Sequence, residues 1–370
     1  MDKKFVMGIA AMAALTLVSC SSDDLDSFSD NSSKNEAISF DGYLGRSAVA
    51  VNGTRGSEVK IGDLQTSAEG FGVFGYHNTT AHGSETEQPF NANLFNNQQV
   101  TYNNSKWTYS PLKFWPSDGH IDFLAYAPYN VGTVDNKYCL DFTVSKTITE
   151  QKDLLWAKTE DQTMANNSGT NKVKFQFKHA LSRLGYTVKL YGDFSKNPAN
   201  KTTFKLKKLT LAGSYPKSTT ETAQAFYTKG TIDLSTGNWT PKDKDKKQDF
   251  EWVSSEKQVS NTGINNDIKD YLFVIPQNFS EKIDGAENTD KLYVIVEYTI
   301  DYGDGTPSVT NTVYKKLTTN FKQGKAYMLN LTLGLPIEFD VNVVEEWKAP
   351  DDGTGDINIG SNDKNPWDRE

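Results

Sequence analysis

The sequence predicts an all-β fold built from β-sandwiches. Short runs rich in aromatic and β-branched residues recur between Gly, Asn, Asp and Pro along most of the 370 residues. Short strands separated by frequent turn signals are typical of sandwiches. No segment sustains the apolar period of an amphipathic helix.

Two of these runs alternate clearly along the chain. In 173–177 the apolar residues occupy every second position, and 291–300 is apolar on one face and mixed on the other. Successive side chains of a strand point to opposite faces, so each run is expected to bury one face. The segment 301–306, DYGDGT, is expected to be a hairpin turn that joins 291–300 to 309–317.

The length of the chain is sufficient for two ordinary domains. A polar stretch at 160–172 marks a candidate division between them. We therefore expect an N-terminal β-sandwich domain at 37–165, a C-terminal one at 166–350 and a tail at 351–370.

The N-terminus has the organisation of a signal peptide. Lys3 and Lys4 precede an apolar run at 5–18, which is too short for a comfortable membrane span. We expect residues 1–19 to be removed from the mature protein.

The end of this run resembles a lipobox, the site where bacterial signal peptidase cuts before a cysteine that becomes lipidated. Its residues are Leu17, Val18, Ser19 and Cys20. Cys20 is therefore the expected lipidation site, with more than one acyl chain, such as palmitate, because one chain anchors weakly. The polar segment 20–36 is expected to be a disordered tether, and its acidic start resembles a surface-export signal of lipoproteins in some Gram-negative anaerobes.

Charge and cysteine content exclude two classes of protein. The net charge of −8 argues against a nucleic-acid partner. The dense charged run at 241–251 mixes both signs, as a solvated loop does. The two cysteines, Cys20 and Cys139, are too few for a disulfide framework.

The sequence shows no motif of an enzyme or of a cofactor site. His77 and His82 lie in a stretch rich in Gly, Thr and Asn, and no Cys or carboxylate completes a zinc-like spacing around them. We therefore expect loop histidines, no metal, no cofactor and no catalytic residue. His179 follows a strand-like run and is expected to make a structural hydrogen bond.

Two further features admit a functional and a structural interpretation. The Asp-rich segments 301–308 and 351–356 lack the ligand spacing of a calcium loop and are expected to be turns. Four tryptophans lie in strand-like runs, namely Trp107, Trp115, Trp156 and Trp239. Core packing is favoured for them over a sugar-stacking platform.

An ordered set of motifs resembles the fimbrillin-like family, the pilins and pilus-accessory lipoproteins of type V pili. Behind the lipobox, the motifs follow in the order ISFDGYLGRS, NGTRGS, FGVFGY, WTYSPLKFWP, IDFLAYAP, DLLWAK, FQFKHALSRLGYTVKL, FVIPQ and FKQGKAYMLNLTL. Each motif is weak alone, but their order is specific, and the resemblance extends from residue 1 to about 347.

The resemblance implies two tandem transthyretin-like β-sandwich domains and no enzymatic activity. It also implies export as an outer-membrane lipoprotein, cleavage after an arginine by a trypsin-like protease, and head-to-tail polymerisation with other pilin subunits by strand exchange. The expected function is a structural, tip or accessory subunit of a cell-surface pilus (fimbria), which supports adhesion to a ligand on a host or bacterial surface.

Strand exchange, as the resemblance implies it, assigns a role to the first apolar run of the mature chain. The removable strand would lie within 37–51, where Ile38 and Phe40 share one face. These side chains would plug a groove in the first domain. Without its strand the groove exposes unpaired backbone groups, which a strand of another subunit can fill.

Two arginines are candidates for the cleavage site. Arg55 is flanked by Gly53 and Gly56 and follows the whole apolar stretch, so we favour it over Arg46. The other alternative is that neither is cut, as in anchor subunits that keep their lipid.

The donor strand is expected near the C-terminus. Phe339, Val341 and Val343 share one face of the run 337–347. This run is either the donor or a permanent strand of the C-terminal domain, with 355–360 in the exchanged tail. The polar end of the chain leaves stalk, tip and anchor positions open.

Two other functions stay open at the level of sequence. One is a surface glycan-binding lipoprotein that does not polymerise and uses exposed tryptophans. The other is a hydrolase, although no pair of carboxylates stands out among the 47 acidic residues.

Overall fold

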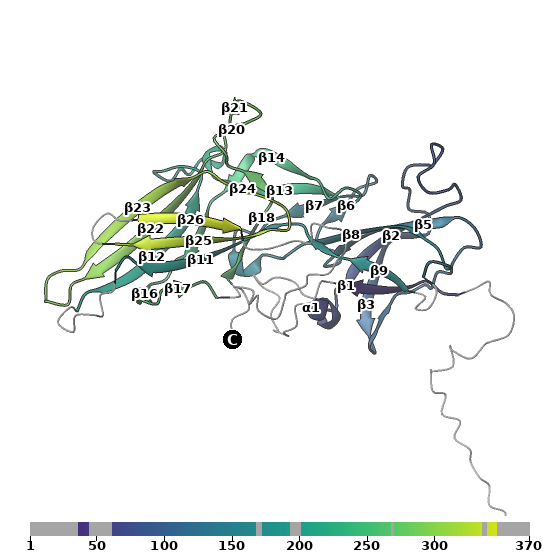
Figure 1. Cartoon of the computed structure of the whole chain (residues 1–370), viewed down its shortest axis with the longest axis horizontal. Helices are drawn as coiled ribbons and strands as arrows, with labels where there is room; N and C mark the ends of the chain where they lie inside the picture. Colours follow the sequence, from purple (N-terminus) through teal and green to yellow (C-terminus); the bar gives the residue numbers. More distant parts are fainter. Residues whose placement is uncertain are drawn as a thin grey trace, which may run out of the picture.

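Two halves joined end to end give the molecule an elongated shape (Figure 1). This computed structural model describes residues 36–43, 61–167, 172–192, 201–267, 270–334 and 339–345. The N-terminal strands lie at one end and the C-terminal strands at the other.

Most of the regular secondary structure in the described residues is β-strand, so the all-β prediction is confirmed. The helical segments within the described ranges are short, namely α1 (Ile61–Thr66), η1 (Ile148–Glu150) and η2 (Glu221–Ala223). Among the residues described, no helix has both the length and the apolar character needed to span a membrane.

A six-stranded antiparallel sheet forms the N-terminal half. In spatial order its strands are β10 (Lys178–His179), β8 (Leu155–Gln162), β5 (His120–Ala127), β2 (Phe71–Asn78), β3 (Phe95–Asn103) and β4 (Lys106–Thr108).

Both faces of this sheet are buried, as β5 shows. Ile121 and Phe123 point into one hydrophobic cluster, the N-terminal core, whose members include Ile38, Phe40, Phe71, Phe95 and Phe175. Leu124 and Tyr126 point into a second cluster, the C-terminal core, which continues into the other half through residues such as Leu184, Phe226 and Val294. A strand buried on both faces reads as a continuous apolar run.

A parallel pair of strands packs against the face of the sheet that carries Ile121 and Phe123. It consists of β1 (Ser39–Tyr43) and β9 (Lys172–Gln176), with Phe40 opposite Val173. In β9 the side chains of Val173 and Phe175 are buried and Lys174 is exposed, so the predicted alternation is confirmed.

Three further sheets, of five, five and four strands, contain most of the remaining described strands. The first contains β17 (Ile264–Asn265), β11 (Ser182–Leu190), β25 (Ala326–Leu333) and β26 (Phe339–Glu345), with β18 (Leu272–Val274) also paired to β11. The second contains β15 (Phe250–Val253), β12 (Thr203–Ala212), β22 (Leu292–Asp301) and β23 (Val309–Leu317), with β16 (Lys257–Val259) also paired to β12. The third contains β14 (Trp239–Gln248), β13 (Phe226–Asp233), β7 (Cys139–Thr143) and β6 (Thr133–Val134).

Two small two-stranded sheets complete the described strands. They are β19 (Gln277–Asn278) with β24 (Asn320–Phe321), and β20 (Lys282–Ile283) with β21 (Ala286–Glu287). The predicted hairpin around 301–306 is confirmed, because β22 and β23 pair antiparallel on either side of it. Every second residue of β22 is buried, as the alternation predicts.

Strand pairing crosses the predicted domain division at 165. β9 follows that position but pairs with β1 in the N-terminal half. Conversely, β7 precedes it but pairs with β13. The division into 37–165 and 166–350 stays a prediction, and these pairings show that the two parts share strands.

The charged run at 241–251 is not the loop that we expected. Most of it lies in β14, at the edge of the third sheet, and its end enters β15. A register shift opposite Thr228 leaves 243–246 bulged, with these charged side chains exposed to solvent. Charges and bulges are common devices on sheet edges, where they hinder pairing with another chain.

Candidate functional site

The side chains of Ile38 and Phe40 fill the N-terminal core. They are only 1% and 2% exposed. Phe40 lies among aromatic rings from five separate segments, and its nearest ring centroids are those of Phe95, Tyr109, Phe175 and Phe123, at 5.4, 5.4, 5.6 and 5.7 Å. Aromatic pairs at this spacing add to the gain from burial.

Backbone hydrogen bonds hold both sides of this segment. The Ile38 N–H donates to the Lys113 carbonyl at 2.8 Å, and the Trp115 N–H donates to the Glu36 carbonyl at 3.0 Å. On the other side, β1 forms its parallel ladder with β9. The segment 36–43 therefore lies between two neighbours, as an inner strand does.

Tyr109 adds a side-chain contact to the same segment. Its hydroxyl donates to the Ile38 carbonyl at 2.6 Å. Burial is the main cause that raises the pKa of this phenol above its ordinary value. Tyr109 therefore stays protonated at neutral pH and keeps its donor.

The proposed donor residues belong to β26. Phe339, Val341 and Val343 stand opposite Leu333, Leu331 and Leu329 of β25, respectively. Within the described strands, β26 ends its sheet and pairs with β25 alone. Of the features predicted for export and assembly, Cys20, Arg46, Arg55 and the segment 355–360 lie outside the described residues.

The four tryptophans pack in the cores as we predicted. Trp107 and Trp115 belong to the N-terminal core and Trp156 to the C-terminal core, whereas Trp239 packs against the latter and donates its Nε1–H to the Ala180 carbonyl at 2.7 Å. Because they divide between two cores, these side chains form no common sugar-stacking platform.

The Asp-rich segment at 301–308 behaves as a turn. Asp301 accepts a hydrogen bond from the Gly303 N–H, and Asp304 accepts one from the Thr306 N–H. The segment 351–356 lies outside the described residues.

The histidines divide into structural and clustered ones. His179 makes the predicted hydrogen bond, with its Nδ1 2.7 Å from the buried carboxylate of Asp153. His77 Nε2 bonds to the Asp118 carbonyl. His82 and His120 instead meet two carboxylates, those of Glu87 and Asp122.

Sequence reasoning missed this cluster because its two halves are separated in sequence by the β3–β4 hairpin. A signal was nevertheless present. His82 and Glu87 lie five residues apart in one loop, whereas His120 and Asp122 lie two apart on a strand and therefore share a face.

Comparisons with known proteins agree with this architecture. The fimbrillin-like family model matches residues 54–347. The fimbrium subunit Fim1C of Phocaeicola vulgatus is 27% identical in an alignment of 401 positions, which covers 95% of this chain and 98% of that protein. A crystal structure of a fimbrial protein from Bacteroides vulgatus is similar in fold, with a TM-score of 0.63 and 22% identity, over 84% of this chain and 98% of that chain. Because the family model spans most of the sequence, the chain belongs to the fimbrillin-like family.

Proposed function

We propose that this protein is a structural, tip or accessory subunit of a cell-surface fimbria, assembled when β1 is replaced by a donor strand from another subunit. The observation that carries the proposal is the burial of Ile38 and Phe40 in the N-terminal core. The segment that joins β1 to α1, residues 44–60, contains both candidate cleavage sites, Arg46 and Arg55.

Cleavage in this segment changes how β1 is held. Burial of Ile38 and Phe40 contributes about 1.5–3 kcal/mol each, before the ordering costs. While β1 is tethered, its effective concentration at the groove is high, and cleavage removes that advantage. A donor with three apolar positions, such as Phe339, Val341 and Val343, then competes on favourable terms.

The positions of the two strands suit a fibre. β1 and β26 lie in opposite halves of the elongated molecule (Figure 1). Exchange between one subunit's groove and another's C-terminal strand is heterologous, and such contacts propagate into filaments when they do not close a ring. Since β26 pairs with one described strand, its release breaks a single ladder.

Lipidation at Cys20 would hold the precursor at the outer membrane before assembly. In cells, Cys20→Ala is expected to yield a precursor without acyl chains. Mass spectrometry of the purified precursor tests this, and acyl chains on the variant would contradict it.

The assembly step is tested with an arginine-specific, trypsin-like protease. The chain has four arginines, Arg46, Arg55, Arg183 and Arg369. Arg183 is only 1% exposed, and a cut after Arg369 removes Glu370 alone. The cut that releases β1 should therefore fall after Arg46 or Arg55 and yield filaments visible by electron microscopy.

Arg55→Ala should block both the cut and the filaments, and Arg46→Ala serves as the matched control. If Arg55→Ala polymerises as well as the parent, the double variant decides between the two sites. Filaments from the double variant would contradict a cleavage-triggered exchange.

A further inference from the structure

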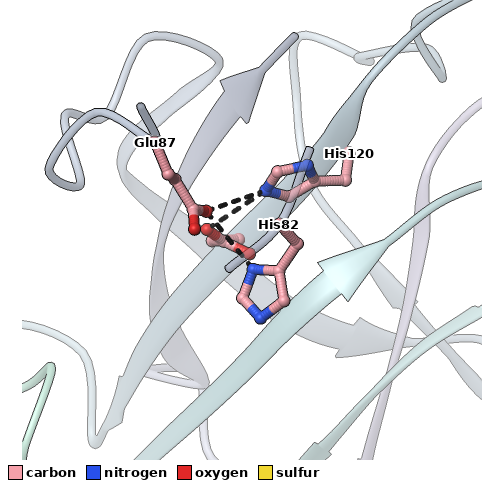
Figure 2. A group of neighbouring side chains, drawn as sticks. His82, Glu87 and His120 are labelled. Carbon is pink, nitrogen blue, oxygen red and sulfur yellow. Dashed lines mark hydrogen bonds and ion pairs between the residues drawn. The ribbon is translucent and has the colours of Figure 1, made fainter. Parts of the chain in front are cut away.

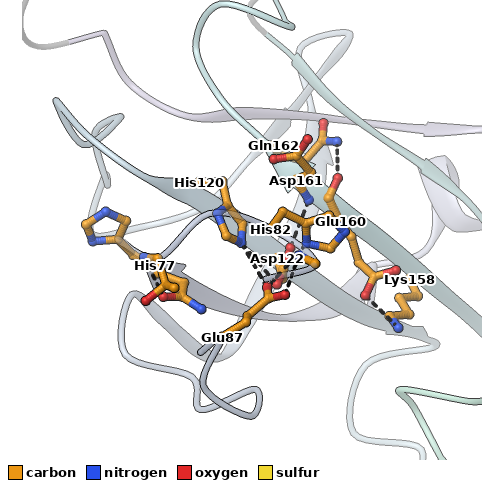
Figure 3. A network of polar contacts seen from close by, with 12 residues as sticks. His77, His82, Glu87, His120, Asp122, Lys158, Glu160, Asp161 and Gln162 are labelled. Carbon is orange, nitrogen blue, oxygen red and sulfur yellow. Dashed lines mark hydrogen bonds and ion pairs between the residues drawn. The ribbon is translucent and has the colours of Figure 1, made fainter. Parts of the chain in front are cut away.

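The 79–94 loop, which joins β2 to β3, brings two side chains onto the start of β5. His82 and Glu87 come from the loop, whereas His120 and Asp122 come from β5 (Figures 2 and 3). His120 and Asp122 continue the face of β5 that further along carries Leu124. The cluster therefore lies where the face of the sheet that packs in the C-terminal core meets the 79–94 loop.

Three of the six distances between the donor atoms match those of a tetrahedral metal site. Glu87 Oε1 lies 3.3 Å from His82 Nδ1 and 3.3 Å from His120 Nε2, and His120 Nε2 lies 3.5 Å from Asp122 Oδ2. All four donor atoms lie within 4.8 Å of one another. Ligands bound tetrahedrally at zinc-like distances are about 3.3–3.6 Å apart.

Backbone amides orient both carboxylates. The Gly83 N–H donates to Glu87 Oε2 at 2.6 Å, and the Asp161 N–H donates to Asp122 Oδ1 at 2.8 Å. Each carboxylate thus uses one oxygen on the backbone and turns the other into the cluster. Such outer contacts typically orient metal ligands.

A bulge in the sheet makes the contact to Asp122 available. Ile121 pairs with Gln162 and Phe123 with Thr159, so two residues of β8 stand opposite Asp122. Bulges re-aim side chains and often lie beside functional sites.

His120 is the buried histidine of the cluster. It is 3% exposed, and its Nε2 lies 3.3 Å from Glu87 Oε1 and 3.5 Å from Asp122 Oδ2 without the geometry of a hydrogen bond to either. Buried polar atoms without partners are uncommon and costly. A divalent cation would satisfy this nitrogen and balance the two negative charges.

We propose that His82 Nδ1, Glu87 Oε1, His120 Nε2 and Asp122 Oδ2 bind one Zn²⁺ ion, which fastens the 79–94 loop to β5. Two imidazole ligands select a transition metal over Ca²⁺ or Mg²⁺. With all four positions taken by protein, the site is structural and leaves no open position for catalysis. The ion would cross-link this loop to β5, as a disulfide cross-links distant segments in other proteins.

Isothermal titration calorimetry of the full chain, stripped of metal by a chelator, tests the site with ZnCl₂. We expect one Zn²⁺ per chain with a dissociation constant of about 1 µM or tighter. His82→Gln and Glu87→Gln change loop residues and should weaken binding at least tenfold. His77→Gln is the matched control, because His77 lies near the same loop but bonds to the Asp118 carbonyl.

Hydrogen exchange gives a second readout that does not depend on calorimetry. Zn²⁺ should slow amide exchange in 79–94 and leave the β20–β21 hairpin unchanged. No saturable binding at one ion per chain, binding unaffected by both ligand variants, or equal weakening by His77→Gln would each overturn the proposal. Because the unprocessed chain is used, the outcome is independent of filament assembly.

Discussion

Phe40 is the residue through which β1 is expected to contribute most to the stability of the fold. It contacts rings from β2, β3, β5 and β9, so its removal leaves a cavity that no single neighbour can fill. We expect Phe40→Ala to lower the free energy of unfolding by about 3–5 kcal/mol. Urea unfolding measures the change.

Phe114→Ala is the control for this prediction. Phe114 is 48% exposed, and a surface substitution of this kind should stay within about 0.5 kcal/mol of the parent. Equal effects of the two variants would mean that β1 does not belong to the folded core in solution.

Asp249 makes the stability depend on pH in an unusual direction. Its Oδ1 accepts the Gly213 and Ala225 amides, and its buried Oδ2 has no hydrogen-bond partner. Burial is the main cause that raises the pKa of this carboxyl above its ordinary value of 3.8. The folded state therefore holds the proton more tightly than the unfolded state, which favours folding at low pH and loses that advantage as pH rises through the folded pKa.

Asp249→Asn keeps an oxygen for the two amides and removes the titration. We expect the free energy of unfolding of the parent, relative to this variant, to fall as pH rises from below 3.8 towards neutrality. Urea unfolding at a series of pH values checks the sign. A difference that is constant or that rises with pH would contradict the assignment.

At the scale of elements, β1 is the strand whose attachment should be adjustable. Ile38→Asp places a carboxylate in an apolar core, which is costly without a partner. We expect faster amide exchange in β1 and β9, with little change in β22 and β23. Asp41→Ala is the control, because Asp41 is exposed on the opposite face of β1. Global unfolding of Ile38→Asp, with all strands exchanging alike, would show that β1 cannot loosen locally.

At the scale of the whole molecule, shared strands predict cooperative unfolding. A fragment of 37–165 lacks β9, whose Val173 and Phe175 are fully buried. We expect this fragment to show no cooperative melting, whereas extension to residue 180 restores β9 and β10 and should recover a transition. Circular dichroism during heating makes the comparison, and a cooperative melt of 37–165 would contradict it.

The same argument applies to the intact chain. The six-stranded sheet contributes to both cores, so loss of one core exposes apolar surface of the other. Differential scanning calorimetry of the full chain should give a single transition. Two well-separated transitions would favour independent domains.

The sequence by itself determined the local features of the fold. The all-β class, the alternation in β9 and β22 and the β22–β23 hairpin all follow from period-two burial and turn chemistry. Motif order pointed to the family, and the burial of the tryptophans followed from their place in strand-like runs.

Only the tertiary structure decided the contacts between distant segments. It pairs β1 in parallel with β9 and brings His82, Glu87, His120 and Asp122 together. It also places the charged run 241–251 largely in a bulged edge strand, which the sequence could not predict because the run has no apolar face. The physical reason is that the side-chain period fixes which face of a strand is buried, whereas the partner of that face is set by packing across the whole chain.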